Sequence, residues 1–245
     1  MPAKPGPLRP HEERLNYTRR EPKEPAPGEP KPGDSFLIVT EGEVTERMYF
    51  ESLRETLQVN PVTVRVVHPS CTDAKGLVHA AMVARDDVAE RRRRCQAGNT
   101  ELAGYDHVWV LFDTDVPARQ GRLGPALDLA RKEGIHVGHS TPSVELWLLL
   151  HFRDRPGPLL TSADARRAVG EAWGQRYDKS AETFQKLWPA LRPNIPAAVH
   201  RAIQVREYHQ RGDTPVPANP STELDLLVRA LDASVQPPLR ILHWK

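Results

Sequence analysis

The sequence predicts an α/β fold, in which a mainly parallel sheet carries helices on both faces and a helical C-terminal region follows. Short apolar runs alternate four times with segments of helical periodicity along residues 36–152. Strands that are continuously apolar are typical of a parallel sheet buried on both faces. After about residue 152 the strand signal disappears, and helical segments broken by proline or glycine follow.

Four strands are expected from short runs of apolar and β-branched residues. They span residues 36–40 (FLIVT), 62–68 (VTVRVVH), 108–112 (VWVLF) and 135–140 (IHVGHS).

Helices are expected between these strands and after them. In the first half, one helix carries the apolar stripe Tyr49, Phe50, Leu53 and Leu57, and three more cover residues about 75–95, 125–133 and 143–152. The last of these, SVELWLLLHF, is apolar nearly all round, which predicts a helix packed in the interior. The second half contains four, over residues 162–173, 180–191, 195–210 and 222–231. Thr222 and Asp225 have the spacing of a capping box at the start of the final helix.

Three regions are expected along the chain: a disordered tail over 1–34, an α/β catalytic domain over 35–152 and a helical region over 153–245 that packs on it. The tail holds nine of the 24 prolines and almost no apolar side chains. Such a segment buries too little surface to offset the entropy lost on ordering.

Charge and cysteine content narrow the class of protein. The formal net charge is +2, divided as +1 over 1–34, −3 over 35–150 and +4 over 151–245. A basic C-terminal half suits a nucleic-acid partner, although both halves also read as ordinary solvated surfaces. The two cysteines have no metal spacing, the N-terminus lacks an apolar signal segment, and the longest apolar run is nine residues. A cytoplasmic protein with no membrane span is therefore expected.

Two of the predicted strands end on acids. Glu41 and Glu43 follow the first strand, and Asp113 and Asp115 follow the third. Ligands of open α/β sheets bind at the carboxyl ends of the strands, and Mg²⁺ prefers carboxylate oxygens. Each acid taken singly also fits a helix cap or a dipole partner. Together they favour a metal site, with Glu43 the weakest member because its side chain could point away along the helix.

Glu145 lies just inside the apolar helix over 143–152. It fits two roles equally well: a partner for the helix dipole, or an acid that reaches the cleft at the strand ends.

The chain resembles the RloB-like family in five successive motifs. They are FLIVTEGEVTERMYFESL, VWVLFDTDV, STPSVELWLLLHF, RYDKS and NPSTELDLLVRAL, spread over residues 36 to about 231. The resemblance implies a Toprim-type catalytic domain, so the sheet is expected to be Toprim-like. It also implies a role in bacterial phage defence and abortive infection, often beside a partner ATPase.

By the same resemblance, the metal ligands carry over to Glu41, Asp113 and Asp115, and Glu145, Tyr177 and Lys179 become candidate site residues. The chain departs from the family where Val44, Arg47 and Thr141 replace a lysine, a proline and an asparagine. Those changes bear on substrate contacts and leave the expected metal ligands in place.

A metal-dependent endonuclease is the function that these features favour. Glu41, Asp113 and Asp115 would hold Mg²⁺ or Mn²⁺, and Lys179 would contact a phosphate oxygen of DNA or RNA. Tyr177 could stack on a base or act as a nucleophile, although a packing role suits it better. One alternative is a non-catalytic interaction subunit of a defence ATPase complex. Another is a different DxD enzyme such as a phosphatase, which expects its DxD after the first strand.

Overall fold

The computed structural model describes residues 30–60, 63–70, 73–87, 104–114, 117–154, 157, 159, 161–212 and 218–242, with the side chains of 117–120 left out. Most of the predicted tail, the end of the helix predicted over 75–95, and Asp115 lie outside these ranges.

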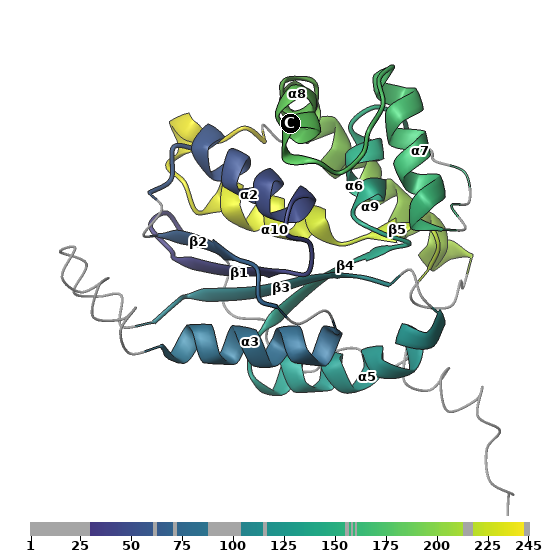
Figure 1. The fold of residues 1–245 in the computed structure, drawn as a ribbon. Coiled ribbons are helices and arrows are strands. Elements are labelled where there is room, and N and C mark those ends of the chain that lie inside the picture. The colour runs from purple at the N-terminus through teal and green to yellow at the C-terminus, as the bar shows by residue number, and fades with distance from the viewer. Residues whose placement is uncertain are drawn as a thin grey trace, which may run out of the picture.

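A five-stranded sheet lies between two layers of helices in the described part of the chain (Figure 1). Its strands lie in the order β2-β1-β3-β4-β5. They are β1 (Phe36–Thr40), β2 (Val64–Val67), β3 (His107–Asp113), β4 (His136–Thr141) and β5 (Ser221–Thr222). The first four pair in parallel, which confirms the predicted mainly parallel sheet.

The fifth strand was not expected. β5 pairs antiparallel with the end of β4, through Ser140 opposite Thr222 and Thr141 opposite Ser221. Two residues are too short to produce a visible alternation, so sequence periodicity could not indicate this strand. The predicted capping box is also wrong, because Thr222 belongs to β5 and Glu223 occupies the N-cap position without a side-chain cap.

Eight α-helices surround the sheet in the described ranges. They are α2 (Thr45–Thr56), α3 (Ala74–Asp86), α5 (Pro117–Lys132), α6 (Glu145–Leu150), α7 (Ser162–Trp173), α8 (Ala181–Leu191), α9 (Ile195–Arg211) and α10 (Leu224–Ala233). Short 3₁₀ turns lie at Arg192–Asn194 and Pro237–Leu239. α5 begins eight residues before its predicted start, because Pro117 suits a first helical turn as well as Pro125, and Gly121 and Gly124 weaken the helical signal.

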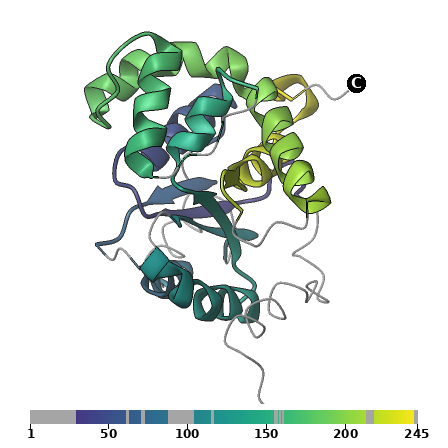
Figure 2. The same ribbon diagram turned by 90° about the vertical axis from the view of Figure 1, so that its right-hand side faces the viewer.

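Alternation along the strands divides the core into two layers. Phe36 and Ile38 face the layer formed by α2 and α6–α10, whereas Leu37 and Val39 face α3 and α5. Figure 2 shows the two helical layers on opposite sides of the sheet. α6 is buried along its whole length, as its apolar sequence predicts.

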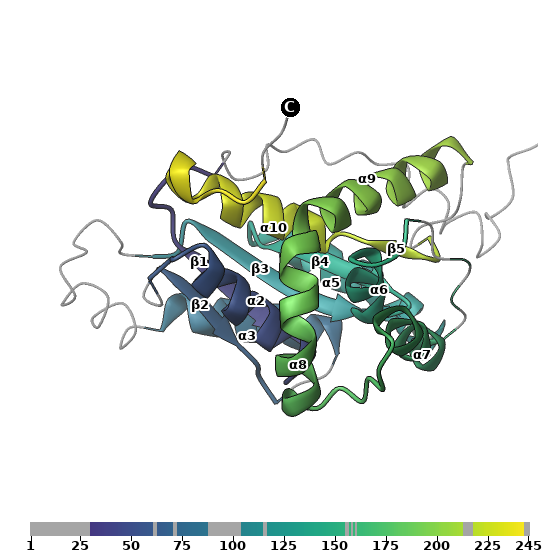
Figure 3. The ribbon, with the colours of Figure 1, turned by 90° about the horizontal axis from the view of Figure 1, so that it is seen from above.

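The C-terminal helices cover the same face of the sheet as α2. α8 packs on α2, α7 and α9 pack on α6, and α10 packs on α9 (Figure 3). Among the residues described, no helix combines the length and the apolar character that crossing a bilayer requires. The arrangement brings the turn between α7 and α8 over the carboxyl ends of β1 and β3, where the acids predicted to form the site lie.

Candidate active site

Glu41 and Asp113 lie side by side because their strands are neighbours. Thr40 of β1 pairs with Leu111 of β3, so both strands end at the same edge. The backbone N–H of Asp113 donates to Glu41 Oε2 at 2.9 Å. Asp113 Oδ1 accepts from the backbone N–H of Val144 at 2.8 Å. Both carboxylates are thus oriented by backbone donors from the adjoining segments.

Glu46, on the first turn of α2, is a further acid that was not predicted for the site. Its side chain is only 4% exposed. A Cβ on Gly42 would lie 1.8 Å from Glu46 Oε2, so the carboxylate occupies the space that the glycine leaves open. A signal for it exists in the sequence: Glu46 precedes Tyr49 and Phe50 by three and four residues, which places it on the buried stripe of α2.

Glu145 and Lys179 form an ion pair next to these acids. Glu145, the first residue of α6, is fully buried. Ser143 Oγ donates to Glu145 Oε2 at 2.6 Å, and Lys179 Nζ lies 2.8 Å from Oε1. Glu145 therefore lies beside the other acids, with its carboxylate paired to Lys179.

We call Glu41, Glu46, Asp113 and Glu145, with Lys179, the acid cluster. Burial raises the pKa of the Asp113 carboxyl well above its usual range; the charges of Glu46 and Glu145 raise it further, and Lys179 opposes them. Burial is also the main cause of the raised pKa of Glu46. Four carboxyl groups facing one ammonium leave an excess of negative charge when ionised.

The acid cluster fits a hard divalent cation in chemistry. When its carboxyl groups are ionised, the net charge of the cluster is negative, and its ligand atoms are carboxylate oxygens, which Mg²⁺ and Mn²⁺ prefer. Among the described side chains, no three or more His, Cys, Asp or Glu residues lie so that together they could hold a metal ion. Glu41 and Asp113 are two of the three predicted ligands, and the third, Asp115, lies outside the described residues.

Comparison with known proteins supplies the family. The model of the family described as RloB-like protein matches residues 36–231. The chain belongs to the RloB-like family. A search among curated proteins returned no match, and neither did a search among solved structures. The matched segment of this RloB-like chain contains every member of the acid cluster.

Tyr177 lies beside the acid cluster, with its hydroxyl against that of Thr45. It is 5% exposed, and the Tyr177 and Thr45 hydroxyls are 2.8 Å apart. Burial raises the pKa of the Tyr177 hydroxyl, and the Glu145 carboxylate adds to the rise. A neutral, buried phenol suits neither base stacking nor nucleophilic attack. Glu43 is exposed, in contrast to the buried Glu46 three residues later.

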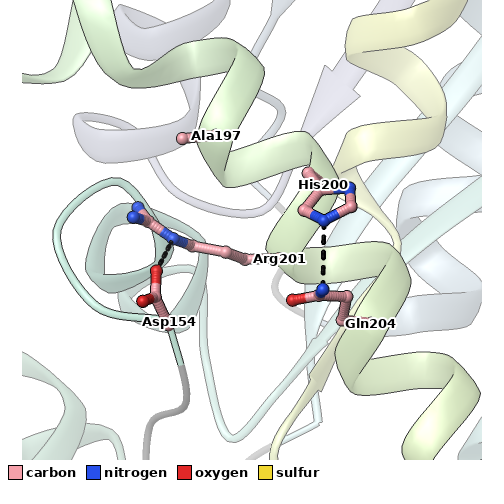
Figure 4. Close-up of a pocket in the computed structure, with 5 residues that line it drawn as sticks. All are labelled: Asp154, Ala197, His200, Arg201 and Gln204. Atoms are coloured by element: carbon pink, nitrogen blue, oxygen red, sulfur yellow. Dashed lines mark hydrogen bonds and ion pairs between the residues drawn. The ribbon is translucent and has the colours of Figure 1, made fainter.

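A separate open hollow lies on the outer face of α9 in the RloB-like chain. Figure 4 shows the five residues that line it: Asp154, Ala197, His200, Arg201 and Gln204. Arg201 already donates to Asp154 and to the carbonyl of Leu150, and His200 is hydrogen-bonded to Gln204. Its polar groups therefore satisfy one another, and the acid cluster remains the candidate active site.

Proposed function

We propose that the acid cluster is the active site of a divalent-metal-dependent endonuclease that hydrolyses phosphodiester bonds. One observation carries the proposal: three carboxyl groups, from the end of β1 and the first residues of α2 and α6, lie close enough to Asp113 at the end of β3 to affect its pKa, and Lys179 lies beside them. Glu41 and Asp113 are held there by backbone N–H donors at 2.9 and 2.8 Å. Strand ends of this kind are where open α/β sheets bind ligands.

In this proposal Glu41 and Asp113, with Asp115, hold Mg²⁺ or Mn²⁺. The bound metal supplies an activated water and offsets charge on the phosphate. The chain's own residues do the positioning. Val144 and Asp113 N–H groups aim the carboxylates, and Lys179 offers an ammonium to a phosphate oxygen. Glu145 favours the charged form of Lys179 and holds its ammonium beside the other acids.

Basic groups near the turn that carries Lys179 suit a nucleic-acid substrate. Arg166 on α7 and Arg176 in the turn that follows are exposed. They lie close enough to Tyr177 and Asp178, respectively, to affect the pKa values of these side chains. Arginines at such positions contact phosphates, which positions a strand without reading its sequence. We extend the proposal to antiphage defence, beside a partner ATPase, because the family resemblance implies that role.

A cleavage assay tests the function. Purified protein is incubated with labelled plasmid DNA, total RNA and tRNA in Mg²⁺ or Mn²⁺, with and without EDTA. The test variant is Asp113→Asn, which keeps an oxygen for the Val144 N–H. The matched control is Asp128→Asn, which removes an exposed carboxylate that pairs with Arg131 on α5.

We expect the wild-type protein to cleave in a metal-dependent way. Cleavage should fall at least 100-fold in Asp113→Asn, because the variant loses a group that stabilises charge in the transition state. Asp128→Asn should cleave at the wild-type rate. Cleavage that survives EDTA, or that Asp113→Asn keeps, would contradict the proposal. If the protein cleaves no substrate, either by itself or with the partner ATPase added, the result would favour the hypothesis that the chain is a non-catalytic interaction subunit.

A further inference from the structure

Lys179 has a backbone conformation that its residue type rarely adopts. Its φ is +63°, in the left-handed region that favours glycine. Gln58, with φ +55°, directly follows the end of α2, where a left-handed residue is ordinary. Lys179 instead precedes Ser180, the N-cap of α8. A lysine kept in this conformation outside a helix end points to a role for its side chain.

The turn that carries Lys179 is fastened on both sides. Ahead of it, the Tyr177 hydroxyl contacts that of Thr45 at 2.8 Å, and both residues are buried. After it, the Ser180 side chain accepts from the Thr183 N–H and so starts α8. Gly170 leaves room for the turn, because a Cβ there would lie 3.0 Å from the carbonyl oxygen of Gln175.

Thr45 is the other half of the connection. It is the first residue of α2, is 3% exposed, and directly precedes Glu46 of the acid cluster. Thr45 and Tyr177 are 132 positions apart in the chain. Their contact therefore joins the segment that carries Glu46 to the segment that carries Lys179. This hydroxyl pair is buried beside the acid cluster.

We propose that Thr45 and Tyr177 are positioning residues that hold the Lys179 ammonium against Glu145, ready for a phosphate. Neither touches the reacting groups. The significance for a phosphate rests on the proposed function, whereas the positioning of Lys179 is a property of the folded chain by itself. Replacing Tyr177 with phenylalanine would leave the Thr45 hydroxyl buried without this partner and release the turn.

The reactivity of the Lys179 amine tests the inference without any enzymatic assay. Folded protein is reductively methylated with formaldehyde and a borane reductant, and peptide mass spectrometry follows the rate at each lysine. Lys186 on α8, which is exposed and pairs with Glu182, serves as the internal reference. An ammonium paired with a carboxylate reacts slowly, because the pairing favours the charged form.

We expect the Lys179-to-Lys186 rate ratio to rise at least threefold in Tyr177→Phe and in Thr45→Val. The matched control is Tyr49→Phe, which removes another buried tyrosine hydroxyl, 3.1 Å from His151 Nε2 in the same core. That control should keep the wild-type ratio. Thr45→Ser, which retains a hydroxyl, should keep it as well.

An unchanged ratio in both test variants would overturn the inference, and so would Thr45→Ser behaving like Thr45→Val. Equal acceleration of Lys179 and Lys186 would also count against it, because it reports loss of the fold and not of one position. If the wild-type protein cleaves no nucleic acid, the proposed function fails, while the methylation ratio still decides the positioning of Lys179.

Discussion

Ionisation of Asp113 is made unfavourable by the acids that surround it. Asp113 is partly buried, and desolvation of its carboxyl, together with the charges of Glu46 and Glu145, raises its pKa well above the usual range. A group with a raised pKa in the folded state contributes stability below its unfolded pKa, and this contribution is lost as the pH rises through the folded pKa. Ionised Asp113 therefore destabilises the metal-free protein.

In EDTA at pH 8, we expect the free energy of unfolding of Asp113→Asn to exceed that of wild type by about 0.5–2 kcal/mol, so that the variant unfolds at a higher urea concentration. The difference should shrink towards pH 4, where the wild-type carboxyl is protonated. Urea denaturation followed by circular dichroism at pH 4.5, 6 and 8 measures it. Asp128→Asn, on the surface of α5, should differ from wild type by less than about 0.5 kcal/mol.

Added Mn²⁺ should reverse the order of stability. A ligand that binds only the folded state stabilises it, by about 2.7 kcal/mol at 100 times its dissociation constant. Wild type should gain in melting temperature and Asp113→Asn should not. An equal gain in both proteins would place the cation somewhere other than the acid cluster.

A glycine is needed at position 42 because the Glu46 side chain occupies the space where a Cβ would lie. Gly42→Ala would place a methyl group 1.8 Å from Glu46 Oε2, the far end of a flexible side chain. We expect Glu46 to swing away, so that the proposed nuclease activity falls at least tenfold while the melting temperature changes by only a few degrees. Gly121→Ala is the matched control, because a Cβ there meets no atom within 4 Å, and it should keep the wild-type activity. A large loss of stability in Gly42→Ala would show that the backbone moves instead.

At the scale of elements, β5 and α10 are tied to α9 by one buried ion pair. Arg206 of α9 donates through Nη2 to Asp225 Oδ2 at 2.7 Å and through Nη1 to the carbonyl of Thr222 at 2.7 Å. Asp225 is fully buried. A second pair joins His139 of β4 to Glu223 at 2.8 Å. Charged contacts thus hold the short antiparallel strand at the edge of the sheet.

We expect Arg206→Met to destabilise the protein by about 3–5 kcal/mol, because Asp225 is left as a buried charge without its partner. Arg211→Met, which breaks an exposed pair with Glu207 on the same helix, should cost at most about 1 kcal/mol. Chemical denaturation of both variants measures the contrast. Similar costs would mean that Asp225 finds another donor or takes up a proton.

At the scale of the whole molecule, the sheet and the C-terminal helices share one core. Ile38 and Trp147 belong to the same hydrophobic cluster as Leu187 and Val199, which lie beyond the predicted boundary at residue 152. The layer of α2 and α6–α10 is therefore one packed unit. Neither part can bury its apolar face without the other.

We expect a single cooperative unfolding transition because of this shared core. Urea curves from far-ultraviolet circular dichroism and from tryptophan fluorescence should coincide. Two separated transitions would instead support residues 35–152 and 153–245 as independent domains.

The sequence by itself determined the four parallel strands, the buried helix α6 and the place of the first acids. Continuous apolar runs predicted four parallel strands, the composition of SVELWLLLHF predicted a buried helix, and Glu41 and Asp113 followed from their positions at strand ends. These features depend on residues a few positions apart, so periodicity and composition report them.

Only the tertiary structure decided which side chains meet. Three contacts join segments whose approach no local pattern encodes. They are the pairing of Lys179 with Glu145, the Thr45–Tyr177 contact and the pairing of β5 with β4. Such contacts depend on how distant elements pack and on where the chain turns between them. The acid cluster therefore became complete only when α2, α6 and the turn before α8 were placed around the ends of β1 and β3.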